Sequence, residues 1–161
     1  QRGTEDGDWS RNHPAQEAKS QMIADRIFLD ANILFSIAYG SPGLNCLWVL
    51  AQKKRCVLFA SNYVVEEAKR NLLSSEQLRK LEAFLSMVQL VPDVDPSIPC
   101  PIELPEKDRP ILLAALSIKA NYLLTGDMIH FGKYFGQTVG GIKICLPRDY
   151  LIITEQRKTK R

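Results

Sequence analysis

Short apolar runs alternate along this chain with segments of helical periodicity. The runs have the length and uninterrupted apolar character of buried strands, and they cover residues 26–30, 56–60, 87–91, 122–125 and 142–146. Apolar residues that recur every three or four positions predict helices between them, over 31–39, 44–53 and 63–72, from Ser74 and Asp108 onward, and in a short turn over 128–134. Strands that alternate with helices predict an α/β fold of three layers, with helices on both faces of a central parallel sheet of about five strands.

Both ends of the chain and one internal loop depart from this pattern. Residues 1–21 hold few apolar side chains and no period, so they are predicted to be a flexible arm, a linker or an expression remnant. Residues 22–154 form the predicted domain, and residues 155–161 form a basic C-terminal tail. Five prolines between Pro92 and Pro105 predict an irregular loop, because each proline removes a backbone donor and restricts its predecessor.

The composition is that of one soluble domain, with 161 residues, 45% of them hydrophobic and 24% charged. The apolar runs fall well short of the roughly 20 residues of a membrane span, and the first 21 residues are polar. We therefore expect a cytoplasmic protein without a membrane partner. The net charge is +3, and the tail carries four basic and one acidic residue, which leaves residues 22–154 nearly neutral. The tail either helps to hold a polyanion or is simply solvated.

Acidic residues occur where the predicted strands end. Asp30 closes the first strand and Asp127 follows the fourth, while Glu66 and Glu67 lie in the first turns of the helix after the second strand and Asp108 opens another helix. The carboxyl ends of parallel strands meet at one edge of a sheet, so these acids are expected to converge there. Two local alternatives stay open. Asp30 is well suited to cap the helix that follows it, and Asp108 to cap a helix with proline in its first turn.

A convergent set of carboxylates predicts a metal site. Like charges packed together repel one another and raise each other's pKa values unless a cation compensates them. The four cysteines match no metal-ligand spacing, and no histidine cluster accompanies the acids. Oxygen ligands alone favour Mg²⁺ or Mn²⁺.

Four segments, in order, carry a resemblance to a known family. They are residues 28–32 (FLDAN), 61–67 (SNYVVEE), 108–115 (DRPILLAA) and 123–127 (LLTGD). Over about residues 27–151 the chain resembles the PIN-domain ribonucleases, a family that includes the toxins of many toxin–antitoxin pairs.

The resemblance implies a set of site residues. It gives catalytic and metal-binding roles to four acids and supporting roles to two polar residues, namely Asp30, Glu67, Asp108 and Asp127, and Asn32 and Thr125. Glu67 is preferred to Glu66 mostly by the resemblance, and it also lies slightly nearer the apolar face of its helix. Many relatives carry a further acid two residues after the last Asp, where this chain has Ile129 followed by His130. The number of ions, one or two, therefore stays open.

The resemblance also implies an activity and partners. It implies Mg²⁺- or Mn²⁺-dependent cleavage of RNA that leaves a 5′-phosphate, an antitoxin protein that binds the enzyme, and a homodimer. Cations near the four segments could guide the RNA backbone or could be ordinary solvated charge; they are Lys107, Arg109, Lys133 and Arg148.

Two other functions compete with the nuclease. One is a catalytically silent PIN-like module that binds RNA or a protein. The other is a phosphohydrolase that forms an aspartyl-phosphate on Asp30, which usually requires a second acid two residues later, where this chain has Asn32. No serine or cysteine with motif context accompanies His130, which argues against a hydrolytic triad.

Overall fold

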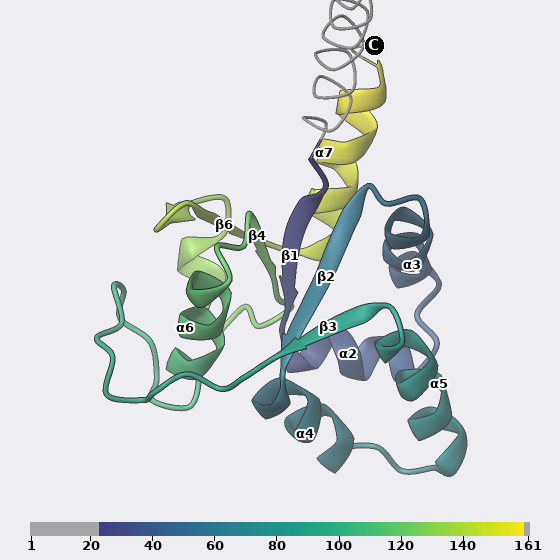
Figure 1. The fold of residues 1–161 in the computed structure, drawn as a ribbon, viewed down its shortest axis with the longest axis horizontal. Coiled ribbons are helices and arrows are strands. Elements are labelled where there is room, and N and C mark those ends of the chain that lie inside the picture. Colours follow the sequence, from purple (N-terminus) through teal and green to yellow (C-terminus); the bar gives the residue numbers. More distant parts are fainter. Residues whose placement is uncertain (1–22, 160–161) are drawn as a thin grey trace, which may run out of the picture.

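A six-stranded sheet with helices on both faces forms the described part of the protein (Figure 1). The computed structural model describes residues 23–159. The strand order is β3-β2-β1-β4-β6-β5. Five strands run parallel to one another: β1 (Asp25–Leu29), β2 (Cys56–Ser61), β3 (Val88–Val91), β4 (Tyr122–Leu124) and β6 (Ile142–Cys145). The predicted α/β class and all five predicted strands are confirmed.

The sixth strand, β5 (Thr138–Val139), was not predicted. It pairs antiparallel with β6 at the edge of the sheet. With two residues it is too short to show an apolar period, and Gly140 and Gly141, both with positive φ, turn the chain between the two strands.

The helices also follow the predicted pattern, with one addition at the C-terminus. They are α2 (Ala31–Ala38), α3 (Asn45–Gln52), α4 (Asn62–Arg70), α5 (Ser75–Leu85), α6 (Arg109–Ser117) and α7 (Pro147–Thr159), with 3₁₀ turns η1 (Pro42–Leu44) and η2 (Gly132–Tyr134). Ser61 and Ser74 start α4 and α5, because their hydroxyls accept the backbone N–H of Val64 and Gln77. Helix α7 was not predicted, and it runs without a break across the boundary placed at residue 154. The proposed N-terminal arm, residues 1–21, lies outside the described residues.

The path of the chain creates one special position in the sheet. From β1 the chain moves to β2 and β3 on one side, and it then returns to β4 and β6 on the other. Helices α2, α3 and α5 accordingly lie on one face and α6 on the other (Figure 1). The direction reverses between β1 and β4, and in open α/β sheets ligands bind at this edge, beyond the carboxyl ends of the strands.

The central strands are buried on both faces. Ile27, Phe28 and Leu29 of β1 and Leu123 and Leu124 of β4 are all fully buried. Such near-continuous apolar strands are typical of parallel sheets covered on both sides, and they explain why the strands were visible in the sequence. Among residues 23–159 no single helix is long and apolar enough to cross a membrane; α2 and the segment η1–α3 reach that length only together, across a bend of 111°.

Helix α7 is attached to the opposite, amino-terminal end of β1. The hydroxyl of Tyr150 donates to Asp25 Oδ2 at 2.8 Å, and Arg157 Nη1 donates to the same oxygen at 2.7 Å. The Tyr150 ring is fully buried and meets Tyr122 edge to face at a centroid distance of 4.8 Å. Arg157, which the sequence assigned to a tail, therefore anchors a helix.

We predict that Tyr150→Phe lowers the free energy of unfolding by about 1.5 kcal/mol, because a buried donor to a carboxylate is lost while the ring is kept. Urea denaturation of both proteins measures the difference. Tyr39→Phe is the matched control, since Tyr39 is exposed and no hydrogen bond of its hydroxyl is found among residues 23–159. An equal effect of the two substitutions would contradict the assigned role of the Tyr150 hydroxyl.

Candidate metal centre

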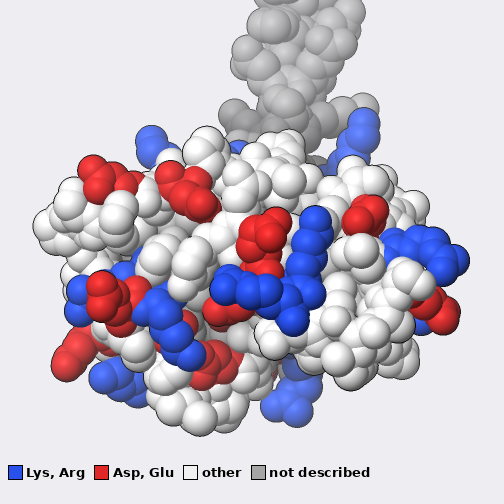
Figure 2. Space-filling view, turned by 90° about the horizontal axis from the view of Figure 1, so that it is seen from below, with Lys and Arg blue, Asp and Glu red and all other residues white. Residues whose placement is uncertain are grey.

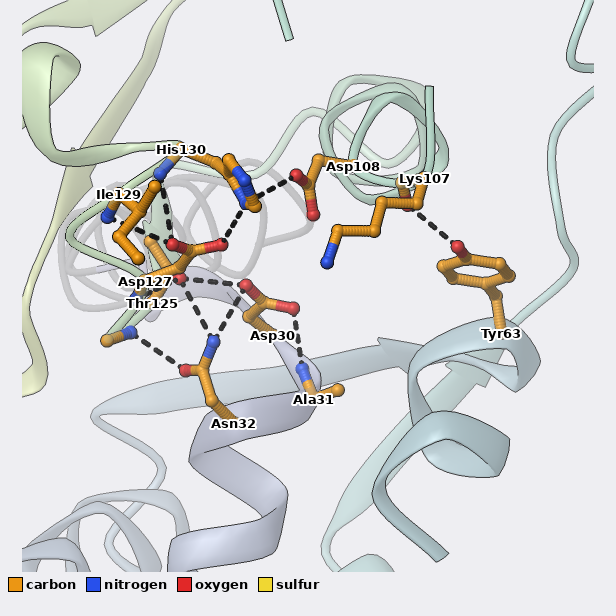
Figure 3. Close-up of polar contacts among 11 residues, drawn as sticks. Asp30, Ala31, Asn32, Tyr63, Lys107, Asp108, Thr125, Asp127, Ile129 and His130 are labelled. Carbon is orange, nitrogen blue, oxygen red and sulfur yellow. Dashed lines mark hydrogen bonds and ion pairs between the residues drawn. The ribbon is translucent and has the colours of Figure 1, made fainter. Parts of the chain in front are cut away.

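Asp30 closes β1 with its side chain buried and both of its oxygens hydrogen-bonded (Figure 3). Oδ1 accepts the backbone N–H of Ala31 at 2.7 Å, which caps α2 and confirms the predicted capping role. Oδ2 accepts the hydroxyl of Thr125 at 2.7 Å and the side-chain amide of Asn32 at 3.1 Å. Asp30 therefore caps a helix and also joins a polar network at the end of the neighbouring strand.

Asn32 connects the ends of β1 and β4. Its Oδ1 accepts the backbone N–H of Gly126 at 2.8 Å, and its Nδ2 lies 3.4 Å from Thr125 Oγ1. A Cβ atom on residue 126 would lie 3.4 Å from Asn32 Oδ1, which is an ordinary van der Waals contact. The two residues predicted to have supporting roles, Asn32 and Thr125, thus share one network with Asp30.

The same network weakens the aspartyl-phosphate alternative. A nucleophilic carboxylate must present an oxygen lone pair to the phosphorus atom. Asp30 is 3% exposed and uses both oxygens as hydrogen-bond acceptors, which lowers its nucleophilicity and shields it from solvent. Its environment suits a positioned, buried charge better than an attacking group.

The buried environment changes the acidity of Asp30. Burial raises its pKa to about 6, although the hydrogen bonds from Thr125 and Ala31 act in the opposite direction. The negative charges of Glu67 and Asp108 contribute to the rise. These acids from distant parts of the chain are therefore close enough to interact, as the sequence predicted.

Asp127 organises the turn that follows β4. Its Oδ1 accepts the backbone N–H groups of Ile129 and His130 at 3.1 and 3.0 Å, and its Oδ2 lies 2.9 Å from His130 Nδ1. Burial opposes ionisation, but the hydrogen bonds from His130 and Ile129 outweigh it and hold the pKa of Asp127 below its ordinary value. Asp127 is therefore a carboxylate at neutral pH.

Asp108 precedes α6 in a buried position, at 5% exposure. Asp108 occupies the N-cap position of α6, as the capping alternative predicted, but its side chain makes no capping hydrogen bond. Burial raises the pKa of Asp108; Asp127 and Glu67 add to the rise, while His130 and Lys107 oppose it. Its Oδ2 is buried and accepts no hydrogen bond from the described residues.

His130 places a nitrogen atom between these two acids. Nδ1 lies 2.9 Å from Asp127 Oδ2 and 3.0 Å from Asp108 Oδ2. One N–H group points well at only one oxygen, and the angles favour Asp127, which is why Asp108 Oδ2 stays without a hydrogen bond despite the short distance. One ligand atom from each of the three residues lies within 4.8 Å of the others.

His130 was not among the site residues predicted from the sequence. Position 129 lacked the further acid of many relatives, and His130 was considered only for a hydrolytic triad. The usable signal was its spacing of three residues from Asp127 in a turn after a strand, where a carboxylate binds the backbone N–H groups two and three residues later and turns the third side chain back.

The structure distinguishes the two adjacent glutamates of α4. Glu67 is half-buried and lines a groove with Asn32, Phe35 and Asn71, whereas Glu66 is exposed. The charge of Glu67 also raises the pKa values of Asp30 and Asp108. The side chain of Glu67 therefore lies in a groove beside Asn32, and its charge acts on Asp30 and Asp108.

The four predicted cations are placed differently. Figure 3 shows the side chain of Lys107 pointing toward the carboxylates of Asp30 and Asp108. Arg109 donates through Nε to the carbonyl of Leu104, Lys133 lies 5.2 Å from the centre of the Tyr134 ring, and Arg148 is exposed in the first turn of α7. Figure 2, which looks onto the edge where the strands end, shows acidic side chains bordered by Lys and Arg.

Comparison with known proteins supports the fold. No family model matches the chain, and no curated protein matches it. Among solved structures, the chain is similar to the crystal structure of VapBC2 from Rickettsia felis bound to a DNA fragment from their promoter, with 18% identity and a TM-score of 0.53. The match covers 74% of this chain and 96% of that chain.

The residues at the switch point fit a divalent cation. They supply two aspartate oxygens and an imidazole nitrogen within 4.8 Å, and one of the oxygens is buried without a hydrogen-bond donor in the described part of the chain. Burial is the main cause of the raised pKa values of Asp30 and Asp108, and neighbouring acids add to it; a cation there would favour the ionised forms of both groups. The donor set is that of a hard or borderline metal.

We predict that ionisation of Asp30 destabilises the metal-free protein. The pKa in the folded protein, about 6, lies above the ordinary value of 3.8, so the folded state favours the protonated form. This contribution is fully present below about pH 3.8 and is lost as the pH rises through about 6, and the difference in pKa corresponds to about 3 kcal/mol.

Urea denaturation from pH 4 to pH 8 tests this prediction. In Asp30→Asn the corresponding loss of stability should disappear, so the variant gains on the wild type as the pH rises. Glu82→Gln, which removes one exposed carboxylate from α5, should keep the wild-type pH profile. Parallel profiles for Asp30→Asn and the wild type would show that Asp30 ionises normally.

Proposed function

We propose that this protein is a metal-dependent endoribonuclease of the PIN type. The observation that supports this most directly is the convergence of Asp108, Asp127 and His130 beside Asp30 at the switch point between β1 and β4. The fold shared with VapBC2 and the four sequence segments that resemble PIN-domain ribonucleases support the same proposal.

The proposed ligands of Mg²⁺ or Mn²⁺, one or two ions, are the four acids Asp30, Glu67, Asp108 and Asp127. When bound, such an ion supplies Lewis-acid polarisation of the scissile phosphate and lowers the pKa of water. Asn32 and Thr125 hold the carboxylate of Asp30 in one orientation through hydrogen bonds of 3.1 and 2.7 Å. This preorganisation keeps the acids in place before RNA arrives.

Lys107 has a separate proposed role. Its side chain points toward Asp30 and Asp108, and its backbone carbonyl accepts the hydroxyl of Tyr63 at 2.7 Å, which fixes the loop before α6. An ammonium group beside the acids can hold a phosphate oxygen of the RNA backbone. We assign weaker backbone contacts to Arg109, Lys133 and Arg148, around the same edge.

The proposed reaction is an in-line displacement at phosphorus. Water attacks the phosphorus atom, the bond to the 3′ oxygen breaks, and the products are a 3′-hydroxyl and a 5′-phosphate. Asp30 and Asp108 are buried, while Figure 2 shows acidic and basic side chains together on the surface at this edge, where we propose that RNA binds. We further propose a toxin role, with an antitoxin protein as partner and with a homodimer as the assembly; the VapBC2 complex supports the partner.

We predict that the purified protein cleaves RNA only with a divalent cation, and that Asp127→Asn lowers the rate by about 100-fold or more, as expected when one electrostatic stabiliser of a transition state is lost. Cleavage of labelled RNA, with EDTA addition and metal rescue, measures both effects. Glu82→Gln is the control and should retain the wild-type rate. A folded, metal-saturated wild type that cleaves no RNA would favour the silent binding module.

The adjacent residues Glu66 and Glu67 allow two similar substitutions to be compared by their effect on the RNA cleavage rate. We predict that Glu67→Gln lowers the RNA cleavage rate at least about tenfold, because its charge acts on Asp30 and Asp108, whereas Glu66→Gln leaves it within about twofold. The two variants remove the same charge from the same helix, so their net charge is matched. Equal losses in both would remove Glu67 from the proposed ligand set.

A further inference from the structure

The imidazole of His130 occupies the point where the carboxylates of Asp108 and Asp127 meet (Figure 3). Its side chain is 28% exposed, and that of Asp108 is 8% exposed. Asp127 contacts His130 twice, because one carboxylate oxygen accepts the backbone N–H and the other lies 2.9 Å from Nδ1. These two contacts hold Nδ1 beside the acids.

The arrangement leaves a buried acceptor without a donor. Nδ1 of His130 is hydrogen-bonded with Asp127, and Asp108 Oδ2, 3.0 Å away from the same nitrogen, is buried without a hydrogen bond among the described residues. A buried carboxylate oxygen without a hydrogen bond is unfavourable, because it has lost its hydration and gained no partner in exchange. A cation in place of the shared proton would satisfy all three atoms at once.

The separations of the three atoms also suit a metal. Neighbouring ligands in an octahedral site with bonds of about 2.1 Å lie ~3 Å apart, and opposite ligands lie ~4.2 Å apart. Nδ1 lies 2.9 and 3.0 Å from the two oxygens, and all three atoms lie within 4.8 Å of one another. Small adjustments would close this set around one ion.

We propose that His130 binds the metal directly through Nδ1, which makes this a mixed nitrogen and oxygen centre that selects Mn²⁺ over Mg²⁺. This inference rests on the proposed metal-dependent function and adds a ligand that the four-acid pattern does not contain. On binding, the Nδ1 proton leaves to solvent. Imidazole favours first-row transition metals, whereas Mg²⁺ prefers oxygen donors and retains its water ligands, so the nitrogen discriminates between the two ions.

The closing experiment detects the metal–nitrogen bond itself. The full chain is loaded with one equivalent of Mn²⁺ and studied by electron spin-echo envelope modulation, which reports ¹⁴N nuclei bound to the ion. The wild type should show imidazole modulation, and His130→Gln should lose it. The chain contains two histidines, so His13→Gln is the matched control and should keep the signal.

Affinities measured by calorimetry provide the second readout. His130→Gln should weaken Mn²⁺ binding by about 10–100-fold and Mg²⁺ binding by less than about threefold, which removes the preference. His130→Asp, which replaces the nitrogen with an oxygen, should still bind Mg²⁺. When loaded with Mn²⁺, this variant should show no ¹⁴N modulation. Circular dichroism before loading shows that each variant is folded, and His130→Asp keeps the test decisive if His130→Gln does not fold.

Two results would overturn the inference: absence of ¹⁴N modulation in the Mn²⁺-loaded wild type, or equal losses of Mn²⁺ and Mg²⁺ affinity in His130→Gln. RNA cleavage by the same preparations separates this inference from the proposed function. Cleavage without nitrogen ligation would leave the nuclease in place and remove His130 from the metal. Nitrogen ligation without cleavage would keep the mixed centre and refute the nuclease.

Discussion

The site depends on bringing like charges together at the edge between β1 and β4, where the order of the strands reverses. Carboxylates in a partly buried space repel one another, and the protein holds them with neutral donors. Thr125 and Asn32 bind Asp30 across the gap between β1 and β4, and backbone N–H groups of a tight turn bind Asp127. Asp108 has no such donor in the described chain, so its Oδ2 is the one buried oxygen of these three aspartates that has no hydrogen bond there.

The sequence predicted the fold well because burial on both faces makes each parallel strand a continuous apolar run. Five strands and the helices between them were visible for this reason. Strand β5 was not predicted because a strand of two residues is too short to show an apolar period. Helix α7 was not predicted because its apolar residues form no clear stripe. Its attachment depends on contacts between Asp25 and residues more than 100 positions away, which local sequence patterns cannot show.

The candidate site was predicted in part. Strand ends and helix starts placed Asp30, Glu67, Asp108 and Asp127 at one edge. The structure brings ligand atoms of Asp108 and Asp127 together with His130, whereas Asp30 and Glu67 lie outside that cluster and act on it through their charges. The donor set was harder to predict, because the direction in which His130 points is decided by a turn that Asp127 closes through its own backbone neighbours. Residue types at regular spacing reveal regular elements; they reveal less about irregular turns, where one side chain determines the orientation of the next.

The attachment of α7 by Asp25, Tyr150 and Arg157 has a consequence for how this protein can evolve. Asp25 and Asp30 bracket β1, so this anchor and the acids lie about 16 Å apart at opposite ends of one rigid strand. Effects of substitutions at such a separation are nearly additive. The C-terminal helix can therefore drift in sequence, or carry a fused segment, while selection on the chemistry acts separately at the other end of the strand.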